Sequence, residues 1–79
     1  MIETIQVVND GIIHSAIFVS ETFALVIWVD VGTEQVYQTN LTIQYAKGKG
    51  FQLIEDGETV LANSYDVSEL LTKCEAALA

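Results

Sequence analysis

Runs of β-favouring residues alternate with tight-turn signals through residues 2–62 of this chain. Val, Ile, Thr, Tyr and Phe fill the runs, and such runs bounded by Gly, Asn and Asp are typical of β-strands. Asn9-Asp10-Gly11 and Asp56-Gly57 favour tight hairpins, because an Asp-Gly pair tolerates the positive φ of these turns. Turns this close together predict antiparallel strands that pair in sequence order. The expected strands are residues 2–8, 12–20, 23–31, 34–45, 51–54 and 59–62.

The third run, residues 23–31, is apolar on both of its alternating faces. These faces carry Phe23, Leu25, Ile27 and Val29 on one side and Ala24, Val26 and Trp28 on the other. A strand with two apolar faces belongs in the middle of a sheet that is covered on both sides. The fourth run has one mostly polar face, which is expected to meet water. That face carries Val36, Gln38, Asn40, Thr42 and Gln44.

The last segment changes from strand periodicity to helix periodicity. Asp66 and Glu69 form a D-x-x-E capping pattern that opens a helix. An apolar stripe follows at helical spacing, made of Val67, Leu70, Leu71, Cys74, Ala77 and Leu78. We expect this stripe to dock on the face of the third strand that carries Phe23, Leu25, Ile27 and Val29.

These elements predict one α+β domain over residues 1–79, an antiparallel five- to six-stranded β-meander with one C-terminal α-helix packed on one face. One helix covers only one face of a sheet. The second apolar face therefore requires either a sheet that curls on itself or a second copy of the chain, because large apolar patches are rarely left bare.

The charge balance is strongly acidic, since eleven Asp and Glu stand against three Lys and no Arg, for a net charge of −8 over 79 residues. This balance argues against direct binding of nucleic acids and against docking on anionic membranes. A hydrophobic content of 51% excludes a disordered acidic tail. Cys74 is the only cysteine and the N-terminus carries no basic leader, so a cytoplasmic protein is expected. The favoured partner is a protein with a basic surface.

The carboxylates outnumber the lysines so far that most of them have no possible cation partner within the chain. The best candidates for partner binding are acids at turns, because turn tips project from a sheet. They are Glu55, Asp56, Glu58, Asp30 and Glu34. An acidic surface of this kind either meets a basic partner or serves only to keep the protein soluble.

No pattern for catalysis, metal binding or cofactor binding stands out. His14 is the only histidine, and no G-x-S-x-G motif positions Ser15 as a nucleophile. Residues 55–58 lack the ligand ladder of an EF-hand loop, and residues 47–50 lack the P-loop pattern. Cys74 lies on the apolar stripe, and burial there is expected to keep its pKa high. We therefore expect a non-enzymatic protein without catalytic residues, metal ligands or cofactor.

In its size, its acidity and its blocks of Glu and Asp, the chain resembles the small acidic phage proteins that inhibit bacterial defence, the anti-CRISPR and anti-restriction proteins. The resemblance implies a protein-binding inhibitor that docks a negatively charged surface on a basic nucleic-acid-handling protein, with DNA mimicry as one form of this action. It also implies the host-cell cytoplasm as its location if a phage encodes it.

The alternative is a homodimeric structural or interaction domain whose acidity serves only solubility. A meander leaves two edge strands with unpaired backbone groups. Glu3 is the only charged residue that guards the first of these strands. The second apolar face of the third strand also needs cover, so both features favour a homodimer.

Overall fold

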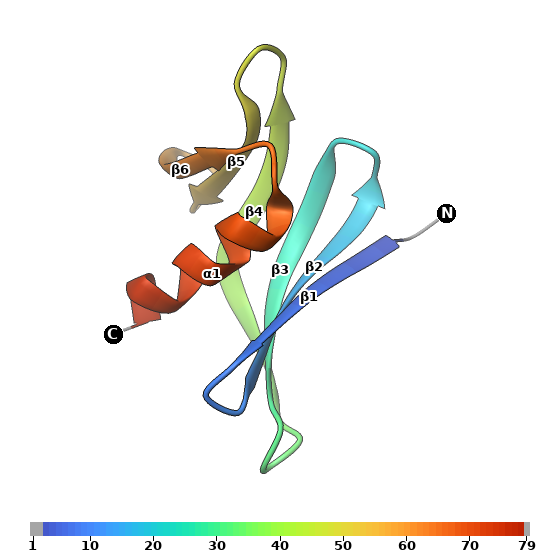
Figure 1. Ribbon diagram of the computed structural model, residues 1–79, viewed down its shortest axis with the longest axis vertical. Helices are drawn as coiled ribbons and strands as arrows, with labels where there is room; N and C mark the ends of the chain where they lie inside the picture. The colour runs from blue at the N-terminus through green and yellow to red at the C-terminus, as the bar shows by residue number, and fades with distance from the viewer. Residues whose placement is uncertain (1–2, 79) are drawn as a thin grey trace.

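Six β-strands and one α-helix make up the structure, a computed structural model that describes residues 3–78, with side chains described for residues 3–74. The elements are β1 (Glu3–Asn9), β2 (Ile12–Ser20), β3 (Phe23–Asp30), β4 (Val36–Ala46), β5 (Gly50–Glu55), β6 (Thr59–Ser64) and α1 (Val67–Leu78). All six strands form one antiparallel sheet in the order β1-β2-β3-β4-β5-β6 (Figure 1). The predicted meander with a C-terminal helix is confirmed. The strand start predicted at Ile2 and the side chains of Ala77 and Leu78 lie outside the described residues.

Two Asp-Gly turns form the hairpins that the sequence predicts. Asp10 and Gly11 have φ angles of 50° and 75°, and Asp56 and Gly57 have φ angles of 55° and 71°. Two successive left-handed residues twist a hairpin in the sense that its strands require. These two turns therefore fix the pairing of β1 with β2 and of β5 with β6.

The helix lies across the opening of a curled sheet (Figure 1). It packs against β1 and β2 on one side and against β5 and β6 on the other. β1 and β6 remain the two edges of the sheet and do not pair with each other within residues 3–78. The helix thus fills the gap that a closed barrel would seal. The core between helix and sheet consists of Ala16, Phe18, Ala24, Val26, Leu41, Ile43, Leu53, Val67, Leu70, Leu71 and Cys74.

The prediction of which face the helix covers was wrong. The helix lies on the side of the sheet to which Ala24 and Val26 of β3 point, and these two side chains are fully or almost fully buried, whereas Leu25 on the opposite face is 45% exposed. Both faces of β3 are apolar, so the periodicity of that strand alone cannot select one. The choice comes from the register with β4. Ala24 pairs with the buried Ile43, and Leu25 pairs with Thr42 on the polar face of β4.

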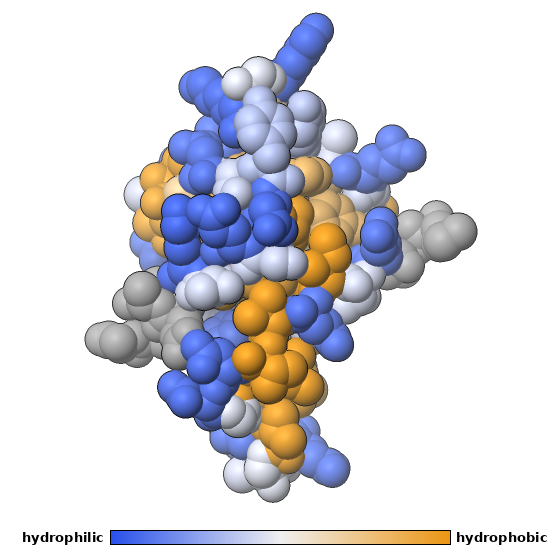
Figure 2. Space-filling model, in the orientation of Figure 1, coloured by the Kyte–Doolittle hydropathy of each residue, from blue (hydrophilic) through white to orange (hydrophobic). Residues whose placement is uncertain are grey.

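The face of the sheet away from the helix stays open among the described residues. One row of directly paired apolar side chains crosses four strands of this face, and its members are Val8, Ile13, Val29 and Val36. Val8 and Val36, at the two ends of the row, are 65% and 61% exposed. The polar side chains of β4 on this face lie mostly at the surface, as predicted. On the side that Figure 2 shows, where the helix lies in front, apolar side chains also gather in a band over the lower half of the molecule.

Candidate functional site

The acidic turn between β5 and β6 is anchored to β4 by its middle carboxylate. The side-chain amide of Asn40 donates to Oδ1 of Asp56 at 2.9 Å, and the backbone N–H of Asp56 donates to the Asn40 carbonyl at 2.9 Å. Glu58 is exposed and Glu55 is half-buried. The tip therefore presents Asp56 and Glu58 to solvent, while Asp56 also holds the turn in place.

The other predicted acids lie in the turn between β3 and β4. One carboxylate oxygen of Asp30 accepts the backbone N–H of Gly32 at 2.8 Å and that of Thr33 at 3.2 Å. Glu34 takes a left-handed conformation with φ 60°, and its N–H donates to the Asp30 carbonyl at 2.7 Å. This turn lies at the lower end of the molecule in Figure 1, away from the hairpin of β5 and β6. The five predicted residues therefore form two separate acidic tips.

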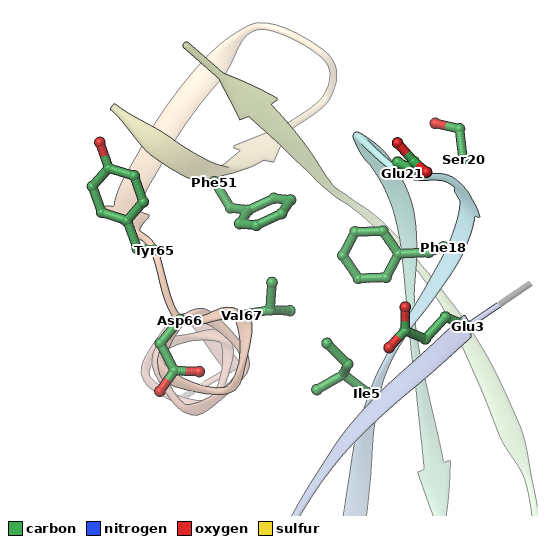
Figure 3. A pocket seen from close by; sticks show the side chains of 9 residues that line it. All are labelled: Glu3, Ile5, Phe18, Ser20, Glu21, Phe51, Tyr65, Asp66 and Val67. Atoms are coloured by element: carbon green, nitrogen blue, oxygen red, sulfur yellow. The ribbon is translucent and has the colours of Figure 1, made fainter. Parts of the chain in front are cut away.

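A pocket of about 380 Å³ opens between the β1–β2 hairpin and the segment where β6 runs into α1. Its lining comes from β1, β2, the turn after β2, β5 and the start of the helix (Figure 3). The lining residues are Glu3, Ile5, Phe18, Ser20, Glu21, Phe51, Tyr65, Asp66 and Val67. The pocket exists because the sheet curls without closing and the helix fills only part of the gap.

The floor of this pocket is apolar and aromatic. Phe18 and Val67 are buried, and Ile5 and Phe51 are partly buried against the same core. The rings of Phe18 and Phe51 meet edge to face with centroids 5.8 Å apart, and Tyr45 meets Phe51 in the same way at 5.2 Å. Packed aromatic pairs of this geometry hold their rings in place. The floor is thus a preformed hydrophobic surface.

Carboxylates form the rim of the pocket. Glu3 is the direct register partner of Phe18, and Glu21 lies in the turn that follows β2. Figure 3 shows these two glutamates on either side of the Phe18 ring, and Asp66 on the far side of the opening with its carboxylate at the start of the helix. No lysine lines the pocket, and the single ion pair among residues 3–74 joins Lys73 to Glu69 at 3.6 Å. The rim is therefore negative, and none of its carboxylates forms an ion pair with a lysine of residues 3–74.

The helix N-terminus fixes the position of Asp66. One carboxylate oxygen of Asp66 accepts the N–H of Ser68 at 3.0 Å, which caps the helix as the D-x-x-E pattern predicts. Glu69 closes the pattern indirectly. The hydroxyl of Ser64 accepts the Asp66 N–H at 3.0 Å and donates to the Glu69 carboxylate at 3.1 Å. This serine therefore joins the end of β6 to the first turn of α1.

Gly50 allows the wall at Tyr65 to come close to β5. Its φ is +82°, and a Cβ added there would lie 3.0 Å from the Ser64 carbonyl oxygen and 3.1 Å from Cγ of Tyr65. A side chain at this position would push Tyr65 and the end of β6 outward. The glycine thus sets the width of the pocket on that side.

His14, Ser15 and Cys74, the residues considered for catalysis, are buried and contact neighbouring side chains of the fold. His14 and Ser15 are consecutive on β2, so their side chains point to opposite faces of the sheet. His14 is buried and its ring meets Trp28 edge to face at 5.9 Å, and the Ser15 hydroxyl accepts a bond from Gln6 at 3.3 Å. Burial raises the pKa of the Cys74 thiol to about 11, as its place on the apolar stripe predicts.

A metal-binding cluster and a membrane-spanning helix are both absent from the described residues. No group of three or more His, Cys, Asp or Glu side chains among them is placed to hold a metal ion. No helix within residues 3–78 has both the length and the apolar character to cross a membrane.

Comparison with known proteins assigns no function to this pocket. No protein-family model, no curated protein and no solved structure matches this chain significantly. Sequence reasoning missed Glu3, Glu21 and Asp66 as a group, because the curl of the sheet brings them together. One sequence signal for the site was present in β1. Glu3, Ile5 and Val7 are spaced two residues apart, so an acid lies on the same face of the strand as two apolar side chains.

Proposed function

We propose that this protein is a small non-enzymatic inhibitor that docks its acidic surface on a basic, nucleic-acid-handling protein. The observation that supports the proposal best is the pocket whose aromatic floor is flanked by Glu3 and Glu21 and whose lining contains no lysine. Protein interfaces combine a desolvated apolar or aromatic centre with a polar rim. Rim carboxylates attract a cationic partner and speed its association.

The two acidic tips add negative charge at turns outside this pocket. Glu55, Asp56 and Glu58 at one turn, and Asp30 and Glu34 at another, are proposed to steer the partner. A protein that handles nucleic acid offers the lysines and arginines that such a surface needs, as do the targets of the anti-CRISPR and anti-restriction inhibitors that the chain resembles. The protein is proposed to act in the cytoplasm. Its net charge of −8 disfavours direct contact with nucleic acid or anionic membranes.

Capture from a bacterial lysate on the immobilised protein tests this proposal. A captured target should be released by duplex DNA at constant ionic strength, because the inhibitor and the DNA compete for one basic surface. Capture should also weaken as salt rises. Capture that resists both DNA and salt would contradict the proposal.

A charge-reversal variant tests the tip at residues 55–58. Changing Glu55, Asp56 and Glu58 to lysine shifts the net charge by +6, from −8 to −2. The variant should associate more slowly with the captured target and show a smaller salt dependence. Asp56→Asn, which can keep the bond from Asn40, is the matched control for loss of the turn anchor. Unchanged affinity and salt dependence in the folded triple variant would mean that the tip is a solvated turn.

A second candidate function is self-association through the open face of the sheet. The directly paired row of Val8, Ile13, Val29 and Val36 favours it, because exposed contiguous apolar rows mark protein interfaces. Light scattering at micromolar concentration should then give about twice the 8.7 kDa mass of one chain. Val36→Asp should restore the single mass, whereas Val31→Asp, at an exposed turn residue, should not. A mass near 8.7 kDa for the unaltered protein would rule this candidate out.

A further inference from the structure

We propose that the pocket between the β1–β2 hairpin and the start of α1 binds an arginine side chain presented by the basic partner protein. This inference rests on the proposed function and names the group that the site recognises. The pocket volume of about 380 Å³ is ample for one long side chain together with part of its backbone. The occupant must be amphipathic, because the floor is apolar and the rim is charged.

The aromatic floor suits a guanidinium group. Phe18 and Phe51 meet edge to face, and Tyr65 stands across the opening from Phe18 (Figure 3). A guanidinium stacks on aromatic faces and is more weakly hydrated than an ammonium, so it loses less solvation on entering such a site. The aliphatic stem of an arginine can lie along Ile5 and Val67, as long cationic side chains do on apolar surfaces.

The carboxylates are held where a guanidinium could reach them. Glu3 pairs directly with Phe18 across β1 and β2. The turn that carries Glu21 is fixed by two bonds: the Thr22 N–H donates to the Ser20 hydroxyl at 3.3 Å, and the Thr22 carbonyl accepts the Tyr45 N–H at 2.8 Å. A planar guanidinium offers five donors in a fork and can bond to more than one carboxylate oxygen at a time. A lysine ammonium is a point charge without this geometry.

Charge complementarity identifies the source of the arginine as a basic protein. A second copy of this chain has no arginine to offer and brings another net charge of −8. Like charges brought together at an interface oppose association. The occupant is therefore proposed to come from a different protein whose surface is cationic.

Binding of short peptides to the isotopically labelled protein, followed by amide and aromatic chemical shifts, tests the inference. The probes are a capped peptide with three arginines spaced by glycine and serine, and its lysine and citrulline counterparts. We expect the arginine peptide to shift the resonances of Phe18, Phe51 and Tyr65 most, and to bind about threefold more tightly than the lysine peptide. The citrulline peptide, which has lost the charge, should produce no saturable shift.

Two charge-matched double variants separate the pocket from general acidity. Glu3→Gln with Glu21→Gln and Glu55→Gln with Glu58→Gln each change the net charge from −8 to −6. The first should weaken binding of the arginine peptide about tenfold, and the second less than twofold. Equal weakening in both would overturn the inference, because net charge alone would then explain binding. Tighter binding of spermidine than of the arginine peptide at these resonances would also overturn it.

The two proposals fail in different ways. If DNA-displaceable capture from the lysate persists in the Glu3→Gln, Glu21→Gln variant and the arginine peptide does not bind the unaltered protein, the arginine site is wrong and the inhibitor function stands. If the peptide fills the pocket and the lysate yields no DNA-displaceable protein, the pocket assignment stands and the proposed target class is wrong.

Discussion

The rings of Phe18 and Phe51 lie edge to face with their centroids 5.8 Å apart, although they come from β2 and β5, which do not pair with each other. This contact bridges the concave side of the curled sheet. It places an aromatic surface beneath the opening that the helix leaves uncovered. The candidate site therefore results from the curvature of the sheet. It also depends on the contacts that hold β5 and β6 close to the helix.

Gly50 is expected to be the glycine at which substitution lowers the free energy of unfolding most. Gly50→Ala places a Cβ about 3 Å from the Ser64 backbone in a left-handed conformation, so we expect a loss of about 2–3 kcal/mol in the free energy of unfolding. Gly48→Ala is the matched control, because Gly48 has φ +83° with nothing within 4 Å of an added Cβ. It should cost only about 1–2 kcal/mol. Urea unfolding of both variants measures the difference, and equal losses would show that Tyr65 and Ser64 move aside freely.

Trp28 is partly buried against the core, and its ring is expected to contribute strongly to stability. Its ring meets His14 edge to face, and its Nε1 is buried without a hydrogen-bond partner among the described residues. Trp28→Ala should cost about 3–5 kcal/mol, which nearly unfolds a domain stable by about 5–8 kcal/mol. Trp28→Phe keeps an aromatic ring and removes the unsatisfied donor, so it should cost less than about 1.5 kcal/mol. A Trp28→Ala variant that folds well and has lost partner binding would instead identify the ring as an interface anchor.

The buried thiol of Cys74 predicts a loss of stability at alkaline pH. Burial raises its pKa from 9.0 to about 11 in the folded protein. Between these pH values the unfolded chain loses the thiol proton and the folded chain keeps it. The contribution of this thiol to the free energy of unfolding is therefore fully present below pH 9 and falls as the pH rises toward 11. The expected loss is about 2–3 kcal/mol. Cys74→Ala lacks this contribution, so its stability should fall less steeply over the same range. Parallel curves for the two proteins would contradict the prediction.

Unbalanced carboxylates predict that salt stabilises the fold. Eleven acids face three lysines, and only Glu69 has a lysine partner within residues 3–74. Repulsion among the remaining acids is screened by salt, so the melting temperature should rise between low salt and about 0.3 M NaCl. A melting temperature that falls with salt would mean that hydrogen bonds of the kind seen at Asp30 and Asp56 outweigh the repulsion.

The parts of the fold that depend on neighbouring residues were predictable from the sequence. The Asp10-Gly11 and Asp56-Gly57 turns and the cap at Asp66 act within a few residues, and their chemistry allows few alternatives. The side of β3 that meets the helix depends on its register with β4. A shift of one residue exchanges the two faces, and both faces of β3 are apolar. The wrong prediction at Leu25 follows directly from that degeneracy.

The candidate site was less accessible to sequence reasoning. Local patterns draw attention to acids next to glycines, such as Asp56, because such residues mark turns. Glu3, Glu21 and Asp66 lie far apart along the chain and carry no shared motif. They meet around one opening only after the sheet has curled and the helix has docked, and that arrangement is set by packing in the core.

The position of α1 between the two edges of the sheet also bears on aggregation. β1 and β6 are the two edge strands of the sheet among residues 3–78, and the helix lies between these edges while it covers the apolar concave surface. If the helix undocks from the sheet, both edge strands and the apolar core surface become exposed to neighbouring molecules at the same time. Fibre formation should therefore begin from this half-open form, at a rate that follows hydrogen exchange of the helix amides, long before the strands themselves unfold.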